Sequence, residues 1–444
     1  MRVNLYISIE KMKNNKTKMI NKLLIIPTLC ISLALSQNRD YPDFEIVVNN
    51  NPYPEDIIIH TMSGEDHFMA ILDTDLSIKW YINSGSRGMG LKVDGDKLTY
   101  FHKDLQEWRV LNGFMQETDT LAASDGLNAD YHDFRLLSDG SYFILSYDSI
   151  TVDMSQFVDN GNPQATIRSV PVIEEFNAEH ELVMEWNGWD NLNIADYTHL
   201  NLTAPEFTWM HVNSIEIDYD NNILISDRRS DDVIKFNRIN GEVIWYLGGP
   251  LSDFTILNDP FGGFSKQHDA RRLDNGNILL FDNGNNHDPP VSRAVEYEIN
   301  EEDYTATMVW EYIHPENYLA AAMGSIQRLS NGNTLINWGT LNGIGAVITE
   351  VDYEKNIVLE IIYPYIYHSY KVRNSNWDFD INLLVGDANL DDSINILDII
   401  YLVNEILYND SDPSVFNLYK VDINKDGSID VTDTIQLVNI ILTS

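Results

Sequence analysis

The residues best suited to chemistry in this chain are three histidines and an arginine, each at the end of a predicted strand. His132 lies in YHDF, His211 in MHVNS and His268 in QHDA. Arg228 lies at the end of the strand that would pair with the one after His211. The start of an apolar strand does not need such groups for packing, so the four residues form a candidate site.

These four side chains suit the transfer of a tetrahedral group. A neutral imidazole acts as a nucleophile when a second group handles the proton. A guanidinium presents a fork of donors that matches a tetrahedral oxyanion, and further histidines protonate a leaving oxygen near neutral pH. The set indicates sulfuryl or phosphoryl transfer. Two alternatives stay open: three histidines that bind zinc, which a neighbouring arginine would oppose, and histidines that are only structural.

A repeated strand–turn–strand phrase must position these residues. The phrase recurs as LKVDGDKLTYF, FRLLSDGSYFILS, IEIDYDNNILISD, RRLDNGNILLFDN and QRLSNGNTLINWG. The turns at Asn222, Gly276 and Gly332 are about 55 residues apart, close to the period of a propeller blade. The sequence therefore predicts an all-β fold, a six-bladed β-propeller, in which equivalent strand ends meet at one end of the central channel. A large β-sandwich is the less favoured alternative. The stretch 150–208 interrupts the period, and we expect its second half to be a long loop that walls one face, with a surface insertion without function as the alternative.

A duplicated unit follows the predicted propeller. GDANLDDSINILDIIYLVNEIL and VDINKDGSIDVTDTIQLVNIIL each run from an acidic loop into an amphipathic helix. The oxygen-bearing residues stand at loop positions 1, 3, 5, 9 and 12; they are Asp387, Asn389, Asp391, Asn395 and Asp398 in the first unit, and Asp422, Asn424, Asp426, Asp430 and Asp433 in the second. This spacing predicts two EF-hand-like calcium loops and resembles type I dockerin modules. A helical hairpin that binds no metal is the alternative.

The overall composition limits the partners of the chain. A formal net charge of −39 repels phosphate backbones, which argues against nucleic acid. Five lysines precede the apolar run LLIIPTLCISLALS, which is too short to span a membrane as a helix. Residues 1–36 are therefore predicted to be a removed export signal. The one cysteine, Cys30, lies inside it. We therefore expect an exported protein without disulfides that is periplasmic, on the cell surface or extracellular.

Several of these phrases together resemble the bacterial arylsulfate sulfotransferase family. They are TWMHVNSIEIDYDNNILISDRRS, GEVIWYLGG, FSKQHDARRLDNGNILLFDNG, SRAVEYEI and GSIQRLSNGNTLINWG, and the resemblance covers most of residues 55–370. It implies a six-bladed propeller with its site at the central channel. It also implies transfer of a sulfuryl group from an aryl sulfate to a phenol by a ping-pong route, without the nucleotide donor PAPS.

The resemblance assigns roles to the four residues. His268 matches the family's nucleophile, which becomes a sulfohistidine. His211 and Arg228 match positions that bind sulfate and move protons, and His132 matches the fourth member of the set. The aromatic residues Trp209, Phe264 and Trp338 are candidate walls for the aryl group, with packing in the blade cores as the alternative for each.

The resulting domain prediction has four parts: an export signal over 1–36, a propeller over 37–375, a linker over 376–384 and a dockerin-like module over 385–444. The dockerin-like module implies a cohesin-type protein partner. Two other functions remain open, a non-catalytic propeller that serves as a binding platform docked to cohesin, and a metal-dependent propeller hydrolase.

Overall fold

The computed structural model describes residues 41–379 except 65, 86, 114 and 125, and residues 385–389, 393–408, 421–424 and 429–443. These residues fall into two compact units, one within Pro42–Ile381 and one that includes the described part of Asn382–Ser444. The predicted export signal lies outside the described residues. Among the residues described, no helix is long and apolar enough to cross a membrane.

The larger unit consists of six sheets, which we number as blades in chain order. From the inner strand outwards, blade 1 contains β27 (His368–Asn374), β2 (Ile57–Ser63), β3 (Asp66–Leu72) and β4 (Ile78–Asn83). Blade 2 contains β5 (Gly88–Asp94), β6 (Lys97–His102), β7 (Glu107–Leu111) and β8 (Glu117–Leu121). Blade 3 contains β9 (Ala129–Leu136), β10 (Tyr142–Val152), β11 (Ala165–Phe176) and β12 (Leu182–Asn187).

The other three blades follow the same plan. Blade 4 contains β14 (Val212–Ile217), β15 (Ile223–Asp227), β16 (Asp232–Phe236) and β17 (Val243–Gly248). Blade 5 contains β19 (His268–Arg272), β20 (Ile278–Asp282), β21 (Arg293–Asn300), β22 (Thr305–Tyr312) and β18 (Thr255–Leu257). Blade 6 contains β23 (Ser325–Arg328), β24 (Thr334–Asn337), β25 (Val347–Val351), β26 (Ile357–Ile362) and β1 (Glu45–Asn49). The predicted six-bladed β-propeller is confirmed.

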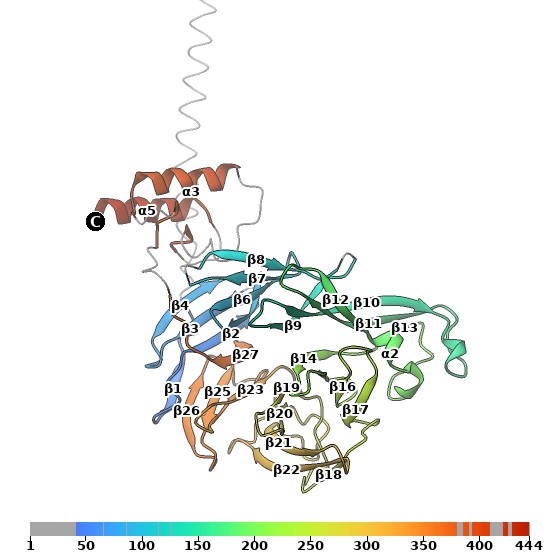
Figure 1. Ribbon diagram of the computed structural model, residues 1–444. Helices are drawn as coiled ribbons and strands as arrows, with labels where there is room; N and C mark the ends of the chain where they lie inside the picture. The colour runs from blue at the N-terminus through green and yellow to red at the C-terminus, as the bar shows by residue number, and fades with distance from the viewer. Residues whose placement is uncertain are drawn as a thin grey trace, which may run out of the picture. The chain divides into compact units, whose positions relative to one another are not determined.

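The ring is closed by strand exchange between the two ends of the propeller. The late strand β27 forms the inner strand of blade 1 by pairing with β2, and the early strand β1 forms the outer strand of blade 6 by pairing with β26. The inner strands of adjacent blades contact each other around the ring, and Figure 1 shows β9, β14, β19 and β23 around its middle. Closure leaves few open sheet edges.

The core lies between neighbouring blades and absorbs the large aromatic side chains. Trp209 and Trp338 are fully buried, and Phe264 is only 6 % exposed, each in a hydrophobic cluster. These three aromatic residues therefore pack in the blade cores, which was the alternative to their forming walls for an aryl group. Their burial stabilises the propeller because apolar surface leaves water.

The expected long loop within 150–208 has more structure than its sequence suggested. It contains the short helices η1 (Met154–Gln156), α2 (Gly188–Asn191) and η2 (Ile194–Asp196), and the strand β13 (Glu206–Thr208). β13 pairs in parallel with β11, and Ile194 and Tyr197 are buried in a cluster with Trp209. The segment is thus an ordered extension of blade 3.

The smaller unit contains two helices of 13 residues each, α3 (Ile396–Tyr408) and α5 (Val431–Thr443). Leu402 and Leu437 are fully buried in its core. The predicted small helical domain is therefore present. At the predicted linker, Trp377 still belongs to the propeller, because its backbone N–H donates to Asp56 Oδ2 over 2.9 Å.

Arg293 holds blade 5 together from within. Its guanidinium is fully buried and pairs with Asp259 at 2.8 Å, Asp282 at 2.9 Å and Glu311 at 2.9 Å. Asp282 directly precedes Asn283, which contacts His268. The network therefore fixes the strand end beside the candidate site.

Replacing Arg293 with alanine should destabilise the propeller strongly. The change leaves two buried carboxylates without their counter-charge, at a cost of about 3–5 kcal/mol in the free energy of unfolding. The control is Arg168→Ala, because the pair between Arg168 and Glu206 is more than half exposed and contributes at most about 1 kcal/mol. Urea unfolding followed by tryptophan fluorescence measures both, and equal losses would contradict this view of Arg293.

Candidate active site

The three predicted histidines stand at the beginnings of inner strands in consecutive blades. His132 lies early in β9, His211 directly precedes β14, and His268 is the first residue of β19. The ring centroids of His132 and His211 are 4.5 Å apart with planes at 76°, and those of His211 and His268 are 6.4 Å apart at 72°. Three residues distant in the sequence thus form one row of imidazoles.

The strands that carry these histidines pair irregularly with their neighbours. The register shifts within the segment 129–134 of β9, beside Asn213 in β14, and between His268 and Arg271 in β19. At the last shift, Asp269 has a left-handed backbone with φ of 59°. Such bulges bend the strand and re-aim side chains. They allow neighbouring residues such as His268 and Asp269 to take different roles.

Arg228 completes the set of four predicted residues. It follows β15, its backbone N–H donates to the carbonyl of His211 over 3.0 Å, and its Nη2 donates to the carbonyl of Ala321 over 3.1 Å. Its Nε is buried and has no hydrogen-bond partner among the described residues. Burial lowers the pKa of Arg228. A guanidinium with an unused N–H beside two imidazoles is suited to hold an anion.

The hydrogen bond to Asn283 fixes the tautomer of His268. The Asn283 amide nitrogen donates to the carbonyls of Ala320 and Met323, both over 3.0 Å, so its Oδ1 must face the ring of His268. That oxygen lies 2.6 Å from Nδ1. Nδ1 therefore carries the proton, and the neutral ring presents its lone pair on Nε2.

Burial keeps two of the histidines neutral. Desolvation lowers the pKa of His268 to about 3, even though the hydrogen bond to Asn283 acts in the opposite direction. The charge of Arg228, and repulsion from His211 and His132 whenever those rings are protonated, lower it further. Desolvation also lowers the pKa of His211 to about 3, followed by the charges of His132 and Arg228. His268 and His211 are thus each within electrostatic reach of the other and of both Arg228 and His132.

His132 has a different environment, because a carboxylate orients it. Its Nδ1 lies 2.5 Å from Asp130 Oδ1, and its backbone N–H donates to the same oxygen over 2.9 Å. The Tyr131 ring stacks on the imidazole with centroids 4.2 Å apart. A carboxylate in this place fixes the orientation of the ring and leaves Nε2 free of that contact.

The sequence reasoning missed the residues that hold this row. Asn213 accepts from the backbone N–H of Asp269 over 3.2 Å and donates to the carbonyl of Gln267 over 2.7 Å, so it grips the chain on both sides of His268. Asp133 and Asp269 each accept from an amide of the next blade, Ile215 and Ile326, over 2.9 Å. The sequence signal that could have identified the two aspartates is the repeated His-Asp pair, His132-Asp133 and His268-Asp269.

The predicted calcium residues are only partly described. Asp391 and Asp426 lie outside the described residues. Asp387, Asp398, Asp422 and Asp433 are buried, and the last residue of each loop accepts backbone amides from its own loop, Asn395 N to Asp398 over 2.8 Å and Asp430 N to Asp433 over 2.9 Å. Within the described part of the chain, no group of three or more His, Cys, Asp or Glu is arranged as a metal site. The position-3 residues of the two loops, Asn389 and Asn424, are also among the described residues.

Known proteins similar to this chain agree with the two units. The family model for arylsulfotransferase (ASST) matches residues 8–371, and the model for the type I dockerin domain matches residues 385–442. A curated relative is the arylsulfate sulfotransferase AssT of Escherichia coli O6:H1, which is 27% identical over 200 residues, 36% of this chain and 33% of the relative. The match thus spans about a third of that protein.

Two solved structures that align with this chain have lower sequence identity to it than the curated relative. A Bacteroides caccae protein of unknown function aligns with a TM-score of 0.44 and 14% identity, over 72% of this chain and 98% of its own. Virginiamycin B lyase of Staphylococcus aureus aligns with a TM-score of 0.39 and 9% identity, over 73% and 89%. The family match rests on the sequence and covers most of it. This chain belongs to the arylsulfotransferase (ASST) family and carries a type I dockerin domain after the propeller.

Proposed function

We propose that this chain is an aryl-sulfate sulfotransferase, which moves a sulfuryl group from an aryl sulfate ester to a phenol through a sulfohistidine on His268. The observation that supports it most is the tautomer of His268, because the Asn283 contact presents a neutral Nε2 lone pair beside Arg228 and two further imidazoles. Family membership agrees with this chemistry. The donor is an aryl sulfate and not the nucleotide PAPS.

In the first half-reaction, His268 Nε2 attacks the sulfur of the donor. The N–S bond forms, the bond from sulfur to the aryl oxygen breaks, and that oxygen leaves with the electron pair. Arg228, through its unused Nε–H, and His211 hold the sulfuryl oxygens. Charge stabilisation of this kind carries most of the catalysis in such transfers.

His132 is the better proton carrier of the two remaining histidines. The pKa of His211 is lowered to about 3, so its ring stays neutral and serves as a hydrogen-bonding group. The Asp130 carboxylate contacts Nδ1 of His132 and orients its ring. His132 delivers a proton to the departing oxygen, then takes one from the phenol that attacks the sulfohistidine, and the N–S bond breaks.

The alternative functions fit the site less well. A metal-dependent hydrolase needs a dication near the histidines, and the Arg228 charge that already lowers the pKa of His268 and His211 opposes it. A binding platform that only docks to cohesin needs no fixed tautomer and no unused arginine N–H. The observation that separates it from an enzyme is turnover.

The C-terminal unit is proposed to be a calcium-dependent dockerin that docks the exported protein onto a cohesin-type partner. Burial of four carboxylates in the two loops is costly without a compensating cation, and oxygen donors of this kind select calcium. The residues present therefore fit the ion. Bound calcium would supply the counter-charge that these loops need.

Labelling should locate the intermediate. Incubation with p-nitrophenyl sulfate and no acceptor should leave one sulfuryl group on a peptide that contains His268, detected by mass spectrometry. His268→Ala should remove the label and lower turnover by roughly a thousandfold or more, because the nucleophile is lost. His180→Ala, which changes an exposed histidine paired with Asp119, should retain both. Full turnover without His268 would contradict the assignment, and no turnover in the native chain would favour the binding platform.

The pH dependence of the first half-reaction should be flat. An ordinary histidine loses its lone pair below about pH 6.5, whereas the pKa of His268 is lowered to about 3, so its ring stays neutral in mild acid. The single-turnover rate of p-nitrophenol release should change little between about pH 8 and about pH 5. This leaving group departs without a proton, so the rate reports the nucleophile. A tenfold fall per pH unit below 6.5, in protein that circular dichroism shows to be folded, would contradict it.

Chelation should separate the two units. Removing calcium with EGTA should reduce the helical circular dichroism at 222 nm, because α3 and α5 provide most of the helix among the described residues. Sulfuryl transfer should continue, since no residue of the row belongs to these loops. Adding calcium back should restore the signal. Loss of transfer together with the helix signal, or an unchanged spectrum, would contradict this part of the proposal.

A further inference from the structure

A large cavity opens at the other ends of the inner strands. Its volume is about 1300 Å³, and it is lined by the ends of β5, β9, β19, β23 and β27 with their turns. The row of histidines lies towards the beginnings of the inner strands, and the cavity reaches it at one residue, His132. Tyr131 lines the cavity beside His132.

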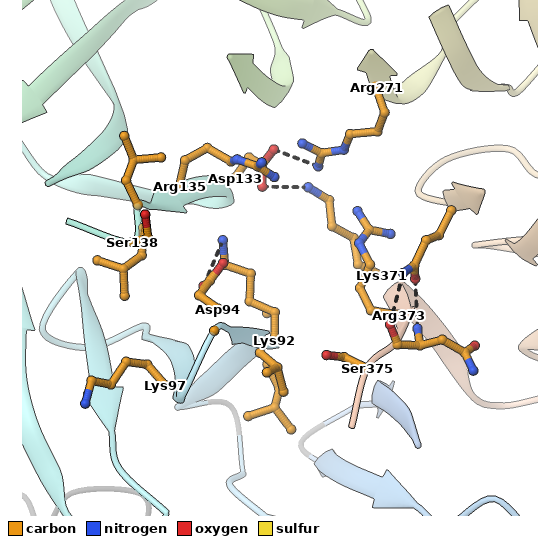
Figure 2. Close-up of a pocket in the computed structure, with 18 of the residues that line it drawn as sticks. Lys92, Asp94, Lys97, Asp133, Arg135, Ser138, Arg271, Lys371, Arg373 and Ser375 are labelled. Carbon is orange, nitrogen blue, oxygen red and sulfur yellow. Dashed lines mark hydrogen bonds and ion pairs between the residues drawn. The ribbon is translucent and has the colours of Figure 1, made fainter. Parts of the chain in front are cut away.

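The charge of the cavity wall differs from that of the chain. Eight lysines and arginines and six acidic residues line it, whereas the whole chain has 29 and 68. Figure 2 shows Lys92, Arg135, Arg271, Lys371 and Arg373 arranged around it. A concave wall with excess positive charge concentrates anions.

Two of these cations have a structural role at the base of the cavity. Arg271 pairs with Asp133 at 2.9 Å and Asp269 at 2.6 Å, and Lys371 pairs with Asp133 at 3.2 Å and donates to the carbonyl of His132 over 2.7 Å. Burial alone would raise the pKa of both carboxyls, but the neighbouring cations lower it, so both stay ionised. In this layer the charges of Arg271 and Lys371 are balanced by those of Asp133 and Asp269. The layer contacts the histidine site through the bond from Lys371 to the carbonyl of His132.

Other cations have donors left over. Arg135 makes one long ion pair, from Nη2 to Glu216 at 3.5 Å, and its side chain is 33% exposed. Arg373 uses Nη1 and Nη2 on Val372 and Asp269, and Lys97 has a 3.4 Å pair with the highly exposed Asp96. Among the described residues these groups retain N–H donors along the wall. These remaining donors take no part in the salt bridges that hold the wall together.

We infer that this cavity is a second anion-binding site, which takes an organic polyanion with two or more sulfate, phosphate or carboxylate groups. The volume exceeds the usual range for a single small ligand, about 300–1,000 Å³. The unused donors of Arg135, Arg373 and Lys97 are spread along the wall and match several oxyanions better than one. Binding at this site does not require the proposed transfer chemistry, because its unused donors come from Arg135, Arg373 and Lys97 and not from the row of histidines.

Binding of two probes to the full chain tests this site. Sucrose octasulfate and phytate present sulfate and phosphate groups respectively, and inorganic sulfate serves as a single-anion probe. Calorimetric titration at low ionic strength should give one polyanion per chain, with an affinity that falls as salt rises. The same affinity is expected in His268→Ala, which separates this result from the fate of the sulfotransferase proposal. The stronger probe identifies the preferred oxyanion.

Substitutions in the wall should weaken that binding. Arg135→Gln with Arg373→Gln should raise Kd by at least about tenfold, and Arg135→Gln with Lys97→Gln should do the same without touching the buried Asp269. Arg168→Gln, an exposed arginine outside the cavity, is the matched control and should bind like the native chain. Absence of saturable binding, unchanged affinity in both double variants, equal weakening in the control, or loss of binding in His268→Ala would each overturn the inference.

Discussion

The contact on which the site depends is the hydrogen bond between His268 Nδ1 and Asn283 Oδ1. It is 2.6 Å long and buried, and the two carbonyls that accept from the Asn283 amide leave no other orientation. Because it places the proton on Nδ1, the lone pair is directed to Nε2. A ring that was free to exchange tautomers would present its nucleophile only part of the time. The blade therefore prepares the imidazole before any ligand arrives.

The surrounding propeller serves this contact through links between blades. Asn213 from blade 4 holds both peptide groups beside His268, and Asp269 reaches an amide of blade 6. The same carboxylate pairs with Arg271, which also pairs with Asp133 of blade 3. The row of imidazoles thus rests on a layer of ions. In a protein with a formal charge of −39, the concentration of cations around the channel is a local exception.

The sequence allowed the blades to be predicted, because repeated turns reveal a period. Since strand starts converge in a closed ring, the three predicted histidines also become neighbours. It did not reveal Asn283, Asp130 or Asn213 as partners. Their roles depend on bulges, which shift the register by a residue and cannot be read from an alternating pattern. Trp209 and Trp338 are fully buried in the blade cores, which was the alternative stated for them. Burial between blades is a tertiary property that residue type alone does not specify.

The most direct test of the account is the protonation of His268, measured by nitrogen NMR on histidine-labelled protein, with His268→Ala used to assign the signal. The account predicts a neutral ring with hydrogen on Nδ1 and no change in charge down to about pH 4–5. Hydrogen on Nε2, or titration near an ordinary histidine pKa of about 6.5, would contradict it. Hydrogen on Nε2 would place the lone pair on Nδ1, and an ordinary pKa would remove the lone pair in mild acid.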